Sequence, residues 1–379
     1  MTEPARLNLP FYPRREAMTL ALLTGIAIVG FVAVTGLSRL YQSQQQSLAE
    51  RWASRGAADL RAQQYAAAAT DFRAALLHAR DSDAYELSLA QALLGMNRTD
   101  EAYAYFLNLW DHEPENGLVN LNLARIAAQK GDTQRALRFY HNAIYATWPG
   151  NQESASRGAR IELIDYLLRN KNVAQAQAEL FALSANLSER SPEQEQAGAL
   201  FLRAQDPQHA LNAFRLALHQ NSSNEAALAG AGAAAFQLGL YPVAEEYLQM
   251  ALRISPGDGA TADRLRKTES VLALDPYRPR ISEAERDTAV VKAFATVGDR
   301  LKTCASRGGS AATEMQDLSQ QWDKLNPQIT ETRLQHDPDL ADTAMSLAFS
   351  IENKSAGACG PPSDSDAALV LIANSQEEE

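Results

Sequence analysis

Small and apolar residues recur with a period of 34 positions along the middle of this chain. Six segments share the pattern, and they are residues 49–82, 83–116, 117–150, 157–190, 191–224 and 225–258. The twentieth position of each is alanine: Ala68, Ala102, Ala136, Ala176, Ala210 and Ala244. The twenty-fourth is large and apolar: Phe72, Phe106, Tyr140, Leu180, Phe214 and Leu248. Such a period predicts stacked helix pairs, because one short pair cannot bury its apolar face without a neighbour.

The first segment adds further residues to this pattern, namely Trp52, Gly56 and Ala75. With these residues the repeat resembles the tetratricopeptide repeat family. Two segments also end in prolines that stop a helix, Pro114 and Pro256. The resemblance covers residues 49–258 and implies an all-α fold. In that fold an α-solenoid of six helix pairs presents a concave face that binds a protein or a peptide.

An insertion of residues 151–156 breaks the period after Trp148, Pro149 and Gly150. We interpret it as an extended turn that divides the array into two sets of three repeats. After the sixth repeat, residues 259–274 combine helical apolar spacing with many charges. An array of repeats exposes a hydrophobic end, so this segment is predicted to be a capping helix.

Residues 18–37 contain no charged side chain. At about 1.5 Å per residue, a helix of this length spans roughly 30 Å, the thickness of a bilayer's hydrocarbon core. The alternatives are a cleaved signal peptide and a buried core helix. A signal peptide usually has a shorter apolar stretch of about 7–15 residues, so we interpret the segment as an uncleaved transmembrane helix. Residues 38–48 are then a helix that connects this anchor to the first repeat.

The charges beside this segment favour one orientation. Three arginines lie in the polar tail of residues 1–17, and Arg39 follows the segment directly. Positive residues tend to stay on the cytoplasmic side, which predicts a cytoplasmic tail and repeats outside the cytoplasm. The predicted localisation is a bacterial inner membrane crossed once, with the repeats in the periplasm.

A different unit is predicted beyond a stiff, proline-containing linker of residues 275–281. Ser282 and Glu285 form a capping box that opens a small helical bundle of residues 282–360. Its first helix has the apolar positions Val290, Phe294, Val297, Leu301 and Cys304, and its third begins at Asp337-Pro338. Residues 328–336 can form an extra turn, which would add to this simple arrangement of three helices. Residues 361–379 are predicted as a tail whose apolar part, from Ala368, can dock on the bundle.

The chain has only two cysteines, Cys304 and Cys359, and both follow the predicted anchor. An up-down-up bundle brings the ends of its first and third helices to the same pole. Cysteines outside the cytoplasm are more often paired than free, so these two are predicted to form a disulfide. The alternative is two unrelated buried thiols.

The sequence offers little sign of chemistry. The formal net charge is −11 and no segment is dense in lysine or arginine, which argues against nucleic acid as a partner. The six histidines are scattered without metal-ligand spacing, and residues 307–310 lack the lysine of a phosphate-binding loop. We therefore predict no enzyme activity, no metal, no cofactor and no small-molecule substrate.

The resemblance places certain positions of each first helix on the concave face. The candidate groove residues are Arg61, Gln91, Arg125, Gln129, Arg169, Arg203, Phe236 and Gln237. Arginine holds carboxylates with two donors, so these residues favour an acidic peptide. The alternative is that the arginines are ordinary solvated residues. Ala53 and Ala57 stand where the family's carboxylate-clamp members have polar residues, which argues against capture of chaperone C-termini.

The predicted function is a membrane-anchored scaffold or adaptor in a bacterial envelope assembly, such as secretion, pilus, or cell-wall or polysaccharide machinery. A periplasmic holding chaperone for exported polypeptides is the first alternative, and it would bind unfolded chains promiscuously. A more remote alternative is an enzyme with its site in the C-terminal bundle, where His336 is the one histidine.

Overall fold

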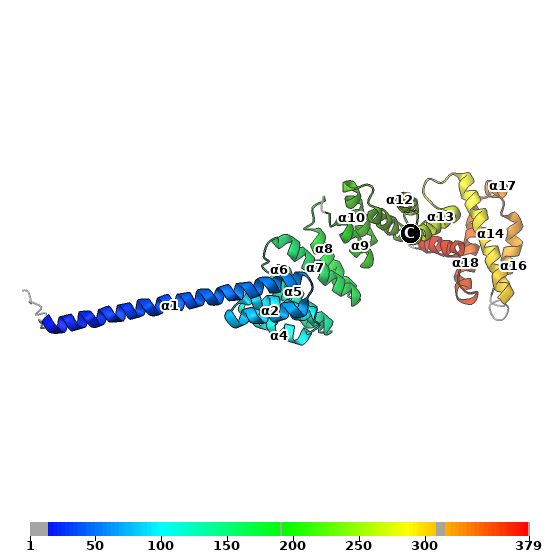
Figure 1. Ribbon diagram of the computed structural model, residues 1–379. Helices are drawn as coiled ribbons and strands as arrows, with labels where there is room; N and C mark the ends of the chain where they lie inside the picture. Colours follow the sequence, from blue (N-terminus) through cyan, green and yellow to red (C-terminus); the bar gives the residue numbers. More distant parts are fainter. Residues whose placement is uncertain (1–13, 190–191, 308–314, 378–379) are drawn as a thin grey trace, which may run out of the picture. The chain divides into compact units, whose positions relative to one another are not determined.

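The computed structural model describes residues 14–189, 192–307 and 315–377 (Figure 1). Within these ranges the regular elements are helices, joined by short turns and one isolated β-bridge, and no strand occurs. The all-α prediction is confirmed. The chain divides into two compact units between Arg160 and Ile161. Most of the predicted tail, residues 1–13, lies outside the described residues, as do residues 308–314 of the predicted bundle.

The first unit holds the apolar segment and three helix pairs. Its helices are α1 (Arg14–Arg61), α2 (Tyr65–His78), α3 (Asp83–Gly95), α4 (Thr99–His112), α5 (Gly117–Gln129) and α6 (Thr133–Tyr145), and the boundary falls within α7 (Gln152–Arg169). The 48-residue helix α1 is continuous from the apolar segment into the first repeat, and its N-terminal half extends beyond the other helices of this unit (Figure 1).

The second unit holds the later helix pairs and the C-terminal helices. The pairs and the helix after them are α8 (Val173–Ser184), α9 (Gln194–Arg203), α10 (Pro207–Gln220), α11 (Glu225–Gln237), α12 (Tyr241–Ile254) and α13 (Gly259–Leu274). The C-terminal elements are α14 (Glu283–Arg307), α16 (Gln316–Leu325), the 3-10 helix η1 (Asn326–Gln328), α17 (Glu331–Leu334), α18 (Pro338–Ala358) and α19 (Asp364–Glu377).

The periodic residues form the core inside each helix pair. All six alanines at the twentieth position are fully buried, and the six large residues at the twenty-fourth are at most 3% exposed. The eighth position packs on the twenty-fourth of the same repeat. A Cβ atom on Gly198 would lie 2.9 Å from the Phe214 ring, and one on Gly232 would lie 2.6 Å from Leu248. Small residues at position 8 therefore let the two helices of a pair approach closely.

The turn inside each pair has the same geometry in all six repeats. Its fifteenth position has φ between 58° and 73°: Gln63, Asn97, Gly131, Lys171, Gln205 and Gly239. The next residue donates its amide to the carbonyl five positions earlier, as Asn172 does to Leu167 at 2.9 Å. This is the Schellman ending of a helix, which needs the left-handed conformation at one residue. Only two of the six residues are glycine, so composition alone does not reveal the motif.

The predicted turn over residues 151–156 is wrong. Asn151 caps α7 by accepting the amide of Ser154 at 3.1 Å, and the helix already begins at Gln152. The side chain of Gln152 turns back and donates to the carbonyl of Ala146 at 2.6 Å. The insertion therefore lengthens the first helix of the fourth repeat, because a capping asparagine and a returning glutamine fix its start.

The C-terminal helices share one hydrophobic core with the end of the array. Residues 275–282 are not helical, as expected of a linker, but the core continues past them from Tyr241, Val271 and Leu274 to Val290 and Phe294. Helix α13, predicted as a cap, packs against both α14 and α19. The expected capping box also forms, with Glu285 accepting the Ser282 amide at 3.1 Å. Helix α17 supplies the extra turn within residues 328–336.

The segment 361–379 differs from the predicted tail. Most of it is helix α19, which begins after Ser363. Asp366 accepts the amide of Ser363 at 2.8 Å, and Ser363 accepts the amide of Asp366 at 3.2 Å. Leu369 and Ile372 are buried in the shared core, so α19 contributes to it directly.

Candidate functional site

In the first unit the candidate groove residues lie on the first helices of three consecutive repeats. Arg61 ends α1, Gln91 lies on α3, and Arg125 and Gln129 lie on α5. All are exposed except Gln91, which is half-buried. The Nε atom of Arg61 donates to the carbonyl of Ala57 at 3.2 Å, one turn earlier. The first helices of repeats 1 and 2 also carry half-buried apolar residues at Leu60, Leu87 and Leu94.

In the second unit two predicted groove residues already have partners. The guanidinium of Arg203 on α9 forms an ion pair with Asp165 on α7. The ring of Phe236 on α11 lies 5.5 Å from that of Tyr241, edge to face, and packs against the C-terminal core. Arg169 and Gln237 are exposed at the ends of α7 and α11. Arg203 therefore links two repeats, and Phe236 belongs mainly to the core.

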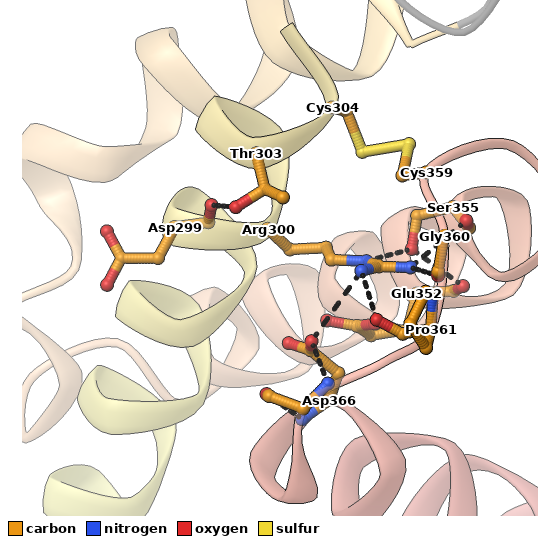
Figure 2. A network of polar contacts seen from close by, with 11 residues as sticks. Asp299, Arg300, Thr303, Cys304, Glu352, Ser355, Cys359, Gly360, Pro361 and Asp366 are labelled. Carbon is orange, nitrogen blue, oxygen red and sulfur yellow. Dashed lines mark hydrogen bonds and ion pairs between the residues drawn. A yellow bond between two sulfur atoms is a disulfide. The ribbon is translucent and has the colours of Figure 1, made fainter. Parts of the chain in front are cut away.

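A buried polar cluster in the C-terminal helices was not predicted (Figure 2). Arg300 of α14 is 4% exposed and donates to four oxygens. Its Nε reaches the Ser355 hydroxyl at 3.0 Å, and its terminal nitrogens reach the carbonyls of Ser355, Gly360 and Pro361 at 3.2, 2.8 and 3.3 Å. Asp366 lies 3.9 Å from the same guanidinium. Arg300 thus fixes the end of α18 and the turn into α19.

Glu352 of α18 belongs to this cluster and is 2% exposed. Burial, together with the nearby carboxylate of Asp366, raises the pKa of Glu352 to about 7, although Arg300 acts in the opposite direction. The sequence contains a signal for this buried carboxyl group. Glu352 follows the inward-facing Ala348 by four positions and Ile351 by one, so it lies on the apolar face of its helix.

A disulfide lies beside this cluster and joins Cys304 of α14 to Cys359 after α18 (Figure 2). The Cα atoms are 4.9 Å apart, and both residues are fully buried. These are the two cysteines that the sequence predicts to pair. The disulfide and the hydrogen bonds of Arg300 both hold the C-terminal end of α18 against α14.

Comparison with known proteins identifies the repeats. Family models described as tetratricopeptide repeat match residues 93–147 and 196–259. The chain contains tetratricopeptide repeats. Each match falls within one of the two units, and the matched residues include the buried alanines and the large buried residues at the twenty-fourth position of repeats 2, 3, 5 and 6.

Several solved structures of repeat proteins are similar to this chain. The TPR protein YrrB, described as having an unusual peptide-binding site, is 17% identical, with a TM-score of 0.41, over 52% of this chain and 97% of its own. The type IV pilus biogenesis factor PilW is 15% identical, with a TM-score of 0.42, over 58% and 98%. PilF of Pseudomonas aeruginosa is 18% identical, with a TM-score of 0.34, over 62% and 96%. No curated protein matches the sequence significantly.

Proposed function

We propose that this chain is a membrane-anchored adaptor whose tetratricopeptide repeats bind a partner protein outside the cytoplasm. The observation that carries the proposal is the continuity of α1. Its apolar part exposes large side chains on every side, from Leu20 at 55% to Met18 at 74%. A helix on the surface of a soluble protein normally has a polar face, so a bilayer is the environment that suits this one.

The contacts of α1 favour an anchor that stays attached to the repeats. Gln45 lies between the apolar segment and the first repeat, and its Oε1 atom is 2.6 Å from Nδ1 of His78 on α2. The helix therefore begins to pack on the repeats soon after it leaves the apolar segment. This arrangement favours a single continuous helix, α1, that runs rigidly from the membrane to the array.

The anchor is tested by fractionating cells that express the full chain. An uncleaved anchor leaves the protein in the membrane fraction after alkaline carbonate washing, with its original N-terminus. A soluble protein that begins near Ser38 would show a cleaved signal peptide and would end the proposal of an anchor.

The compartment and the orientation are part of the same proposal. A buried disulfide suits an oxidising compartment, and the arginines before the apolar segment favour a cytoplasmic N-terminus. We place the repeats in a bacterial periplasm, within an envelope assembly. In spheroplasts, added protease should then digest the repeats and leave the N-terminal tail intact. Protection of the repeats from protease would show the opposite orientation, with the repeats in the cytoplasm.

The partner surface that we propose is the row of first helices with Arg61, Gln91, Arg125 and Gln129. Exposed arginines and half-buried leucines suit a peptide with carboxylates and apolar side chains. Arg61→Glu combined with Arg125→Glu should abolish capture of the partner in a mild-detergent pull-down. The matched control reverses two exposed arginines of the same unit, Arg73 and Arg80.

The second unit allows a parallel comparison. Arg169→Glu tests an exposed residue of a first helix, and Arg215→Glu is the control on the second helix α10. Arg203 is left unchanged because Asp165 already pairs with it. Retention of the partner by both groove variants would refute the concave-face proposal. Capture of many unfolded chains without fixed stoichiometry would favour the holding chaperone instead.

A further inference from the structure

The ends of repeats 2 and 3 form a hollow on the first unit, and none of the proposed groove residues lines it. Its apolar walls are Pro114, Trp148 and Pro149, and its acidic residues are Glu113 and Glu115. Trp148 and Pro149 precede the insertion that breaks the repeat period. The hollow therefore depends on a segment that distinguishes repeat 3 from a regular repeat.

Trp148 is held in place by three contacts. Its Nε1 donates to the carbonyl of Ala143 at 2.8 Å, and its backbone amide donates to Oε1 of Gln152 at 2.7 Å. The ring also lies directly against Gly117, where a Cβ atom would come within 2.3 Å of it. An aromatic surface fixed in this way loses little further side-chain freedom when a ligand binds.

The two loops that form the hollow are also joined through their backbones. Thr147 donates its amide to the carbonyl of Glu115 at 2.8 Å, and Gly117 donates its amide to the carbonyl of Thr147 at 2.9 Å. These bonds form the isolated parallel bridge between Asn116 and Thr147. The hollow is therefore preformed in the folded unit.

The charges around the hollow select a cation. Glu113 is oriented by Asn116, whose Nδ2 donates to Oε2 of Glu113 at 3.0 Å, and the Glu115 side chain is exposed. Neither lysine nor arginine is among the lining residues. The start of α5 offers little attraction to an anion, because Gly117 donates to Thr147 and the amide of Val119 donates to Oδ1 of Asn116.

We propose that this hollow binds a lysine or arginine side chain of a partner protein. The cation lies over the face of Trp148, the best aromatic partner for a cation, and its charge is balanced by Glu113 and Glu115. The site is separate from the arginine-lined first helices, which are proposed to bind acidic groups. The two surfaces therefore make independent contacts of opposite charge.

A peptide that carries fluorescein on its N-terminal nitrogen, fluorescein-Gly-Arg-Gly-Arg-Gly-amide, tests this with the full chain in a neutral detergent. Fluorescence anisotropy should detect binding of this peptide and no binding of its glutamate counterpart. Glu113→Gln combined with Glu115→Gln should weaken binding of the basic peptide about tenfold or more. The control pair, Asp100→Asn and Glu101→Gln, removes the same charge from α4 of the same unit and should change the affinity less than about twofold.

A second variant tests the aromatic contact. Trp148→Phe keeps an aromatic ring and should weaken binding about threefold, because phenylalanine attracts cations less than tryptophan. Thermal unfolding shows whether each variant is folded, and the glutamate pair decides the result if Trp148→Phe is not. The proposal is overturned if wild type does not bind the basic peptide, if both peptides bind equally, or if the control pair loses as much affinity as the glutamate pair.

Discussion

Glu352 lies on α18 close to Arg300 and Asp366, and its Oε1 atom is buried without a hydrogen-bond partner among the described residues. Two carboxyl groups here share one guanidinium, so the neutral form of Glu352 fits the site better than the charged form. Protonated Glu352 can donate a hydrogen bond to Asp366, which leaves one carboxylate opposite Arg300. This balance predicts that the stability of the second unit depends on pH.

The folded pKa of Glu352, about 7, lies above its ordinary value of 4.5. The folded state therefore holds this proton more tightly, and stability should fall as the pH rises from about 4.5 through 7. The full effect is on the order of 3 kcal/mol. Glu352→Gln resembles the protonated form, so it should raise the thermal midpoint at pH 8 and flatten its dependence on pH between 5 and 8.

The control for this prediction is Glu246→Gln, on the exposed side of α12. It should leave the pH dependence as in wild type. Equal pH dependence in Glu352→Gln and wild type would show that Glu352 stays charged across this range in the folded protein.

The helix pairs are the elements that give the array its regularity, and their turns limit which residues fit. Lys171 has φ of 60°, and Gly239 occupies the same position of repeat 6 with φ of 69°. A side chain in the left-handed region costs roughly 1–2 kcal/mol, and glycine avoids most of this cost. Four of the six turns therefore carry some strain that the Schellman bonds offset.

Substitutions at these turns should have opposite effects on stability. Lys171→Gly should raise the free energy of unfolding by about 0.5 kcal/mol, after allowing for the greater freedom of glycine in the unfolded chain. Gly239→Ala should lower it by about 1 kcal/mol, although a Cβ atom there meets nothing within 4 Å. Chemical denaturation in detergent would measure both changes.

Gly158 is a suitable comparison because it lies within α7 and a Cβ atom there also meets nothing within 4 Å. Gly158→Ala should stabilise the protein, since alanine is about 1 kcal/mol better than glycine inside a helix. Similar effects of alanine at Gly158 and Gly239 would mean that backbone conformation does not decide stability at these turns.

At the scale of the whole molecule, the second unit has one continuous core from α12 to α19. A bundle beyond a flexible linker would unfold alone, whereas a shared core predicts that α12 and α13 loosen with the bundle. The disulfide closes a sequence separation of 55 residues, so its loss should cost about 4 kcal/mol on the chain-entropy model.

Cys304→Ala combined with Cys359→Ala tests this shared core. Hydrogen exchange should become faster in α18 and α19, and also in α12 and α13 of the same unit. The shared core contains no residue of the first unit, so exchange there should stay the same. Faster exchange confined to residues 283–377 would show that the bundle is an independent domain.

The repeat architecture could be predicted from the sequence, because the small residue at position 8 packs on the large residue at position 24 of the same repeat and the alanine at position 20 is buried in the same helix pair. Because these contacts are local and recur in every repeat, they produce a periodic pattern in the sequence. The capping box at Ser282 and the start of α18 at Asp337 were predictable for the same reason.

Features that join distant segments could not be predicted, because they depend on packing between helices. Arg300 meets Ser355 and Gly360 across 55 and 60 positions, and α19 covers α13, which ends about 90 positions earlier. The hollow at Trp148 likewise needs two loops joined by a backbone bridge. A sequence pattern records which face of a helix is apolar, but the partner of that face is fixed by packing between elements.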